Sequence, residues 1–204
     1  GLAAISKQRF HGWVMGGSNA TGVAADWLTG LWGQSAGNHL ARASAAAAEE
    51  QAGLALLDLL DLPRESSVGF VTGATMANFT CLAAARGEVL RRAGWDVEAD
   101  GLFGAPPITV ILGEEAHSTV FAAIKYLGLG AQRVIKVDVD RNGAMIPAAF
   151  ADAIAQASGP IIVIAQAGQI NTGAFDPFVA IAQAVRAKGG WLHIDGAFGL
   201  WARA

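Results

Sequence analysis

One acidic residue, Asp195, follows an apolar run at the start of the segment Trp191–Gly199. The run has the composition of a strand buried on both faces, which would deliver the carboxyl group at the strand's C-terminal end. In open α/β sheets this edge binds ligands. A carboxylate there needs a cation or hydrogen bonds to offset its desolvation. The protonated ring nitrogen of a pyridine cofactor would be such a cation, and capping of the turn after the strand is the alternative interpretation.

A second segment, Val71–Asn78, joins a predicted strand to a predicted helix through small and hydroxyl-bearing residues. Free backbone N–H groups at a helix N-terminus, the helix dipole and the Thr75 hydroxyl together suit a phosphate. Gly73 permits close approach of the backbone. The segment matches neither the Walker-type loop nor the dinucleotide fingerprint, and an ordinary capped turn is the alternative interpretation.

A third segment, Glu114–Thr119, carries His117 after another predicted strand. Its ring could stack on a flat cofactor or act as an acid or base near neutral pH. Capping or packing is the alternative, and Ser118 is itself a predicted N-cap for a helix from Thr119. We predict no metal site, because the other histidines lack ligand-like spacing with His117: His11, His39 and His193.

A fourth polar segment, Gln166–Pro177, follows the predicted strand that ends at Ala165. Its amides and hydroxyl would line the same sheet edge as the other three segments. Each segment alone is a weak signal. Four polar strand ends on successive parallel strands, however, would converge on one cleft.

The elements that would position these segments alternate between short β-branched runs and longer helical patterns, which is typical of a mostly parallel sheet in a three-layer α/β/α fold. The predicted strands are Val68–Val71, Ile108–Leu112, Val134–Val139, Ile161–Ala165 and Trp191–Ile194. The predicted helices are Met76–Arg92, Thr119–Leu127, Pro147–Ala157 and Pro177–Lys188, the last with Asp176 as its predicted cap.

The first part of the chain differs, because residues 1–66 offer no strand and one long Ala-rich helix, Ala41–Leu60. We therefore expect two regions, a helical segment of residues 1–66 and an α/β region of residues 67–204.

Composition narrows the function classes. The 204 residues are 53% hydrophobic and 15% charged, which suits one sizeable core. A net charge of -3 without a Lys/Arg run argues against nucleic acid as a partner. No segment has the length of an apolar membrane span. The single cysteine, Cys81, is expected to be a small buried hydrophobe, and its isolation favours a reducing, cytoplasmic location.

Four segments in order resemble the group II pyridoxal-phosphate-dependent amino-acid decarboxylases, of the aspartate-aminotransferase-like fold type I group. They are Thr72–Asn78, Ala116–Thr119, Asn171–Pro177 and His193–Gly199, and Phe10–Asn19 resembles the family's N-terminal substrate-side segment. The resemblance covers nearly the whole chain. It implies the large domain of a PLP-dependent transferase-like fold, pyridoxal 5'-phosphate as cofactor, and loss of carbon dioxide from an L-amino acid.

By position, the resemblance assigns a phosphate-binding pair to Ala74 and Thr75, with Gly73 and Asn78 as neighbours. His117 matches the histidine that stacks on the ring and helps position the reacting complex. Asp195 matches the acid that pairs with the ring nitrogen. Ala197 matches the small residue on the other ring face. Gln169 stands where some relatives have threonine, so Gln169, Asn171 and Thr172 receive no detailed role.

The resemblance also implies a lysine that holds the cofactor covalently, several dozen positions beyond the aspartate. The chain ends nine residues after Asp195, at Ala204, and none of its four lysines lies in a matching segment: Lys7, Lys125, Lys136 and Lys188. We therefore expect a fragment that is inactive alone, from a homodimeric parent. The alternatives are another fold type I enzyme, such as a desulfurase or an aldolase-type lyase, and a non-catalytic paralogue that acts as a binding or assembly module.

Overall fold

The computed structural model describes residues 17–34 and 37–204. The chain forms two compact units, one that ends at Phe70 and includes Arg203–Ala204, and one of Val71–Ala202. No described helix is both long enough and apolar enough to cross a lipid bilayer.

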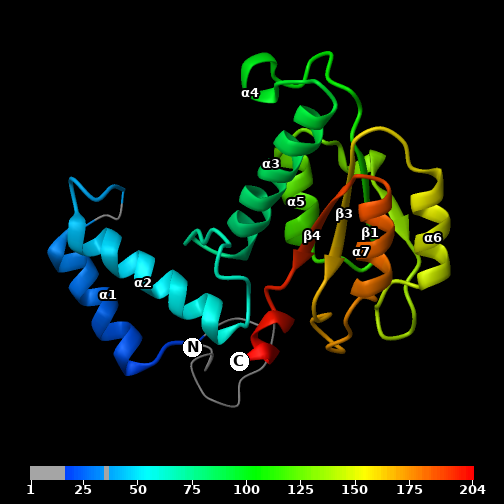
Figure 1. The fold of residues 1–204 in the computed structure, drawn as a ribbon. Helices are drawn as coiled ribbons and strands as arrows, with labels where there is room; N and C mark the ends of the chain where they lie inside the picture. The colour runs from blue at the N-terminus through cyan, green and yellow to red at the C-terminus, as the bar shows by residue number, and fades with distance from the viewer. Residues whose placement is uncertain (1–16, 35–36) are drawn as a thin grey trace, which may run out of the picture. The chain divides into compact units, whose positions relative to one another are not determined.

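The larger unit is built on a four-stranded parallel sheet in the order β2-β1-β3-β4 (Figure 1). Its strands are β1 (Thr109–Gly113), β2 (Ile135–Val137), β3 (Ile161–Gln166) and β4 (Trp191–Asp195). The helices α3 (Ala74–Arg92) and α5 (Ser118–Tyr126) cover one face, and α6 (Pro147–Gln156) and α7 (Phe178–Ala187) cover the other. The predicted three-layer α/β/α architecture with a parallel sheet is confirmed.

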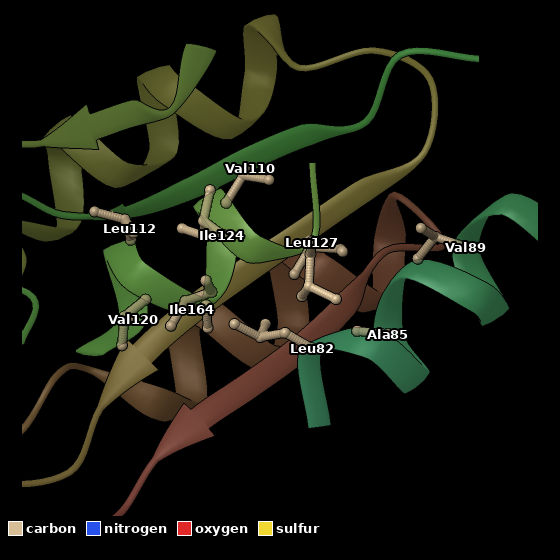
Figure 2. Close-up of a cluster of buried hydrophobic side chains, with 11 residues drawn as sticks. Leu82, Ala85, Val89, Val110, Leu112, Val120, Ile124, Leu127 and Ile164 are labelled. Carbon is tan, nitrogen blue, oxygen red and sulfur yellow. The ribbon is translucent and has the colours of Figure 1, made fainter. Parts of the chain in front are cut away.

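Two hydrophobic clusters hold the layers together, one on each face of the sheet. Ile162 and Ile164 of β3 point into the cluster under α3 and α5, which Figure 2 shows in close-up, while Val163 points into the opposite cluster. This alternation follows from the period of two along a strand. It also explains why β3 is apolar along nearly its whole length, since both of its faces are buried.

The N-terminal unit contains α1 (Ala20–Trp32) and α2 (Ala43–Leu59). The predicted long helix of residues 41–60 is confirmed by α2, whose alanines have the highest helix propensity. The helix α1 was not predicted, although it has clear end signals. The Asn19 side chain caps its start by accepting the N–H of Gly22, and Gly33 ends it in the left-handed conformation at φ 56°. The remaining elements are the short helices α4 (Val97–Asp100), η2 (Ala131–Arg133) and η3 (Gly199–Arg203).

The sequence-based predictions of a strand at residues 68–71 and of a buried cysteine are wrong. Residues 68–71 form no strand, and Val68, Phe70 and Val71 are exposed. A β-branched run becomes a strand only by pairing with another strand. Within the described residues, no strand pairs with residues 68–71. Cys81 is exposed rather than buried, because the neighbouring Leu82 takes the position that faces the sheet.

Candidate functional site

The loops after the parallel strands leave the sheet at one edge, and three of the four predicted segments lie there, at the ends of β1, β3 and β4. The remaining segment, Val71–Asn78, follows no strand, so the prediction of four polar strand ends is wrong for it. The strands end there at Gly113, Val137, Gln166 and Asp195. This is the edge at which open α/β sheets bind ligands.

The carboxylate of Asp195 is held at this edge by two neutral donors. The residue is only 8% exposed. Its Oδ2 accepts a hydrogen bond from Nδ2 of Asn78 at 3.1 Å, and its Oδ1 accepts one from the backbone N–H of Ala197 at 3.1 Å. The second bond caps the turn after β4, as the alternative interpretation expected. The donors fix the orientation of the carboxylate but bring no positive charge, so the site suits a cationic ligand such as a pyridinium nitrogen.

His193, to which the sequence analysis assigned no functional role, lies next to this carboxylate. Its Nε2 is 2.8 Å from Oδ1 of Asn78. Burial lowers the pKa of His193, while the nearby charge of Asp195 acts in the opposite direction. The signal for His193 was its place two positions before Asp195, which puts both side chains on the same face of β4.

The ring of His117 is fixed at the start of α5. Its Nδ1 accepts the backbone N–H of Thr119 at 3.3 Å and lies 2.9 Å from Oγ1 of Thr119. The predicted cap at Ser118 is therefore wrong. His117 has the extended backbone of an N-cap residue, and its own ring satisfies the free N–H, which leaves Ser118 as the first helical residue.

The N-terminus of α3 offers backbone donors to an anion. Gly73 is its N-cap residue, no described side chain caps it, and Ala74 and Thr75 are exposed. The first N–H groups of a helix have no partner within the helix. Thr75 precedes Asn78 by three positions, so the two residues share a helix face. Exposed donors and a hydroxyl at a dipole's positive end fit a phosphate.

The loop after β3 is shaped by two buried polar side chains. Oε1 of Gln169 accepts the N–H groups of Asn171 and Thr172 at 2.6 and 3.0 Å, and its Nε2 donates to Glu115 at 3.2 Å. Gln169 thus fixes the conformation of its own loop.

Asp176 does not cap α7 as predicted. Its two oxygens accept the N–H groups of Met145 and Gln166 at 2.8 and 2.7 Å, and the cap residue is Pro177. Burial raises the pKa of Asp176, and these two donors oppose the rise. Asp176 therefore joins the segment after β2 to the end of β3.

The structure brings Asn78, His117, Asp195 and Ala197 together through hydrogen-bond contacts, directly or through Thr119. The phosphate-site residues lie at the start of α3, about one helical turn before Asn78, and no described hydrogen bond joins their side chains to this group. No cluster of His, Cys, Asp and Glu that could hold a metal ion occurs in residues 17–34 and 37–204. Residues 10–16 of the predicted substrate-side segment lie outside the described residues.

The arrangement agrees with a comparison against protein families. Residues 1–201 match the model of the pyridoxal-dependent decarboxylase conserved domain. The chain belongs to the pyridoxal-dependent decarboxylase family. The predicted family, with its pyridoxal cofactor, is thereby confirmed.

Individual relatives support the same assignment. This decarboxylase-family chain is 37% identical to cysteine sulfinic acid decarboxylase of Rattus norvegicus over 51% of its own length and 22% of that protein. It is 32% identical to L-2,4-diaminobutyrate decarboxylase of Rhizobium meliloti over 74% of its length and 29% of that protein. The crystal structure of mouse CSAD in apo form superimposes with a TM-score of 0.81 at 28% identity, covering 96% of this chain and 40% of that one. The chain thus spans less than half the length of these relatives.

Proposed function

We propose that the full-length protein removes the carboxylate of an L-amino acid as carbon dioxide and leaves an amine, with pyridoxal 5'-phosphate as cofactor. One observation carries the proposal. In a chain of this family, a buried carboxylate stands at the ligand-binding edge of the sheet with neutral donors only among its described hydrogen bonds. A cationic ring nitrogen would complete that site.

The start of α3 would hold the phosphate. Gly73, Ala74 and Thr75 offer exposed backbone and hydroxyl donors at the positive end of a 19-residue helix. The residues fit a dianion because no described side chain already occupies these donors.

The ring would lie between His117 and Ala197, with its nitrogen at Asp195. Bound pyridoxal phosphate supplies a cationic ring that accepts the electrons left when carbon dioxide departs. Asp195 would keep a proton on the ring nitrogen and so keep the ring cationic. His117, whose Nδ1 accepts the backbone N–H of Thr119 and lies beside its hydroxyl, would present its Nε2 side to the reacting complex.

Carbon dioxide release by the full-length protein tests this function. Purified protein with added pyridoxal phosphate is incubated with glutamate, cysteine sulfinate, 2,4-diaminobutyrate and the aromatic amino acids. We expect carbon dioxide and the matching amine from at least one of them, together with a visible absorbance band from the bound cofactor.

Other products would point elsewhere. Sulfide or an aldehyde without carbon dioxide would indicate a desulfurase or an aldolase-type lyase. Absence of both the absorbance band and any product would contradict the proposal and favour a non-catalytic binding module.

We further propose a homodimer, supported by the exposed apolar surface of α1 in the N-terminal unit. The helix has no buried residue, and Trp27 and Leu31, one turn apart, are 74% and 80% exposed. Neighbouring Leu28 and Trp32 extend this apolar surface. Large exposed apolar patches with tryptophan are typical of protein interfaces.

Sedimentation of the full-length protein tests the homodimer. We expect a dimer for the unchanged protein, and a shift toward monomer for Leu31→Asp because the substitution places a charge in the buried interface. Val179→Asp, at a position 74% exposed on α7, is the matched control and should leave the dimer intact. A monomeric unchanged protein, or a Leu31→Asp dimer of undiminished stability, would rule the interface out.

We also propose that the protein works in the cytoplasm. The presence of one cysteine, Cys81, in 204 residues supports a reducing compartment. Fractionation of the source cells, with the protein detected outside the cytoplasmic fraction, would overturn this location.

A further inference from the structure

Asn78 is buried in the larger unit and uses both hydrogens of its amide within the protein. The residue is 3% exposed. Nδ2 donates to Oδ2 of Asp195 at 3.1 Å and to Oγ1 of Thr119 at 3.3 Å, and Oδ1 lies 2.8 Å from Nε2 of His193. A phosphate accepts hydrogen bonds, and Asn78 has no hydrogen left to donate to one.

Chemistry fixes which way the amide points. An ionised carboxylate can only accept, so the nitrogen of Asn78 must face Asp195 and the oxygen must face His193. Nε2 of His193 then has to carry a hydrogen. The lowered pKa of this buried ring is consistent with a neutral imidazole that donates through Nε2.

The same network continues to His117 across the neighbouring helices α3 and α5 (Figure 1). Oγ1 of Thr119 accepts from Asn78, so its own hydrogen is free to donate to Nδ1 of His117, 2.9 Å away. The backbone N–H of Thr119 donates to that atom too. Nδ1 therefore carries no hydrogen, and the ring N–H of His117 is on Nε2.

We propose that Asn78 is a positioning residue for the cofactor ring rather than a phosphate ligand, because it holds Asp195 and His117 in one hydrogen-bond network. The inference rests on the proposed function, which assigns the ring nitrogen to Asp195 and a ring face to His117. Asn78 would act on the ring through these two residues. Its loss would weaken ring binding whether or not a phosphate is attached.

A comparison of two ligands separates these roles. The full-length protein, freed of cofactor, is titrated with pyridoxal phosphate and with pyridoxal, which lacks the phosphate, and each dissociation constant is read from the visible absorbance. Asn78→Ala should weaken both ligands by the same factor, about tenfold, as loss of a supporting hydrogen-bond partner does at metal sites. Thr75→Ala should weaken pyridoxal phosphate alone, because it acts at the phosphate.

Two further variants keep the experiment decisive. Gln156→Ala removes an exposed amide on α6, at the opposite face of the sheet, and should change neither constant. Thr119→Val removes only the hydroxyl that links Asn78 to His117, and should weaken both ligands equally but by less than Asn78→Ala. If circular dichroism shows that Asn78→Ala does not fold, Thr119→Val decides the question.

The possible results are distinct. Equal weakening of both ligands, with folding retained, supports the inference. Weakening of pyridoxal phosphate alone would make Asn78 a phosphate ligand and overturn the inference, as would unchanged binding of both. If the unchanged protein binds neither ligand, the proposed function fails first and the inference falls with it.

Discussion

Replacing Asp195 with alanine in the full-length protein is expected to lower kcat for decarboxylation roughly 100- to 1000-fold, the range seen when one preorganised electrostatic contact is removed from an active site. Without the carboxylate the ring nitrogen would lose its proton, and the ring would accept electrons poorly. The effect should fall on kcat more than on KM, because the substrate itself does not contact Asp195 in the proposed arrangement.

The Asp195→Asn variant separates the effect of the negative charge from that of the side chain's size. The amide keeps the size of the side chain and an oxygen that can accept the N–H of Ala197, so the turn after β4 should persist. It lacks the negative charge, so turnover should fall nearly as far as in Asp195→Ala. The exposed Asp152 on α6 provides the control, since Asp152→Ala should leave turnover unchanged. Near-normal turnover in Asp195→Asn would refute the role assigned to the charge.

Leu82→Ala is expected to destabilise the larger unit by about 2–5 kcal/mol, the usual cost of emptying a buried leucine site. The side chain is 0% exposed and comes from α3 into the cluster between the helices and the sheet (Figure 2). Urea unfolding followed by circular dichroism measures the loss in the free energy of unfolding. Protein concentrations are matched between variants because any association also contributes to apparent stability.

Leu59→Ala is the matched control for this measurement. It makes the same chemical change in another helix, α2, at a position that is 52% exposed. The loss there should stay below about 1 kcal/mol, because less apolar surface leaves water on folding. Equal losses for the two variants would show that the cluster around Leu82 does not carry the stability of its unit.

The sheet strands and the helices α3, α5, α6 and α7 of the larger unit followed from the sequence because their periodicity is strong and local. The run Ile161–Ala165, apolar throughout, became the central strand β3, buried on both faces. The run Val68–Val71 has the same local pattern but no described partner strand, and pairing cannot be read from a short segment alone.

Sequence order also placed His117 and Asp195 at the same edge, because the carboxyl ends of parallel strands lie together. It did not reveal how they are held. Asn78 starts an inward-facing stripe on α3, with Leu82, Ala85 and Val89 at helical spacing after it, which marks its side chain as buried. A buried amide needs partners. These lie 41, 115 and 117 positions away, so no local pattern identifies them.

The long distance along the chain between Asn78 and its partners has a consequence for how the larger unit folds. A contact across 117 positions closes a long loop, and such contacts form slowly because the entropy of closure precedes any gain from the contact. Asn78 cannot acquire its partners His193 and Asp195 until β4 has joined the sheet. A ligand that binds the finished network shifts the equilibrium toward the folded chain by mass action. The supply of pyridoxal phosphate in the cell would then influence how much of the protein accumulates, in addition to how much of it is active.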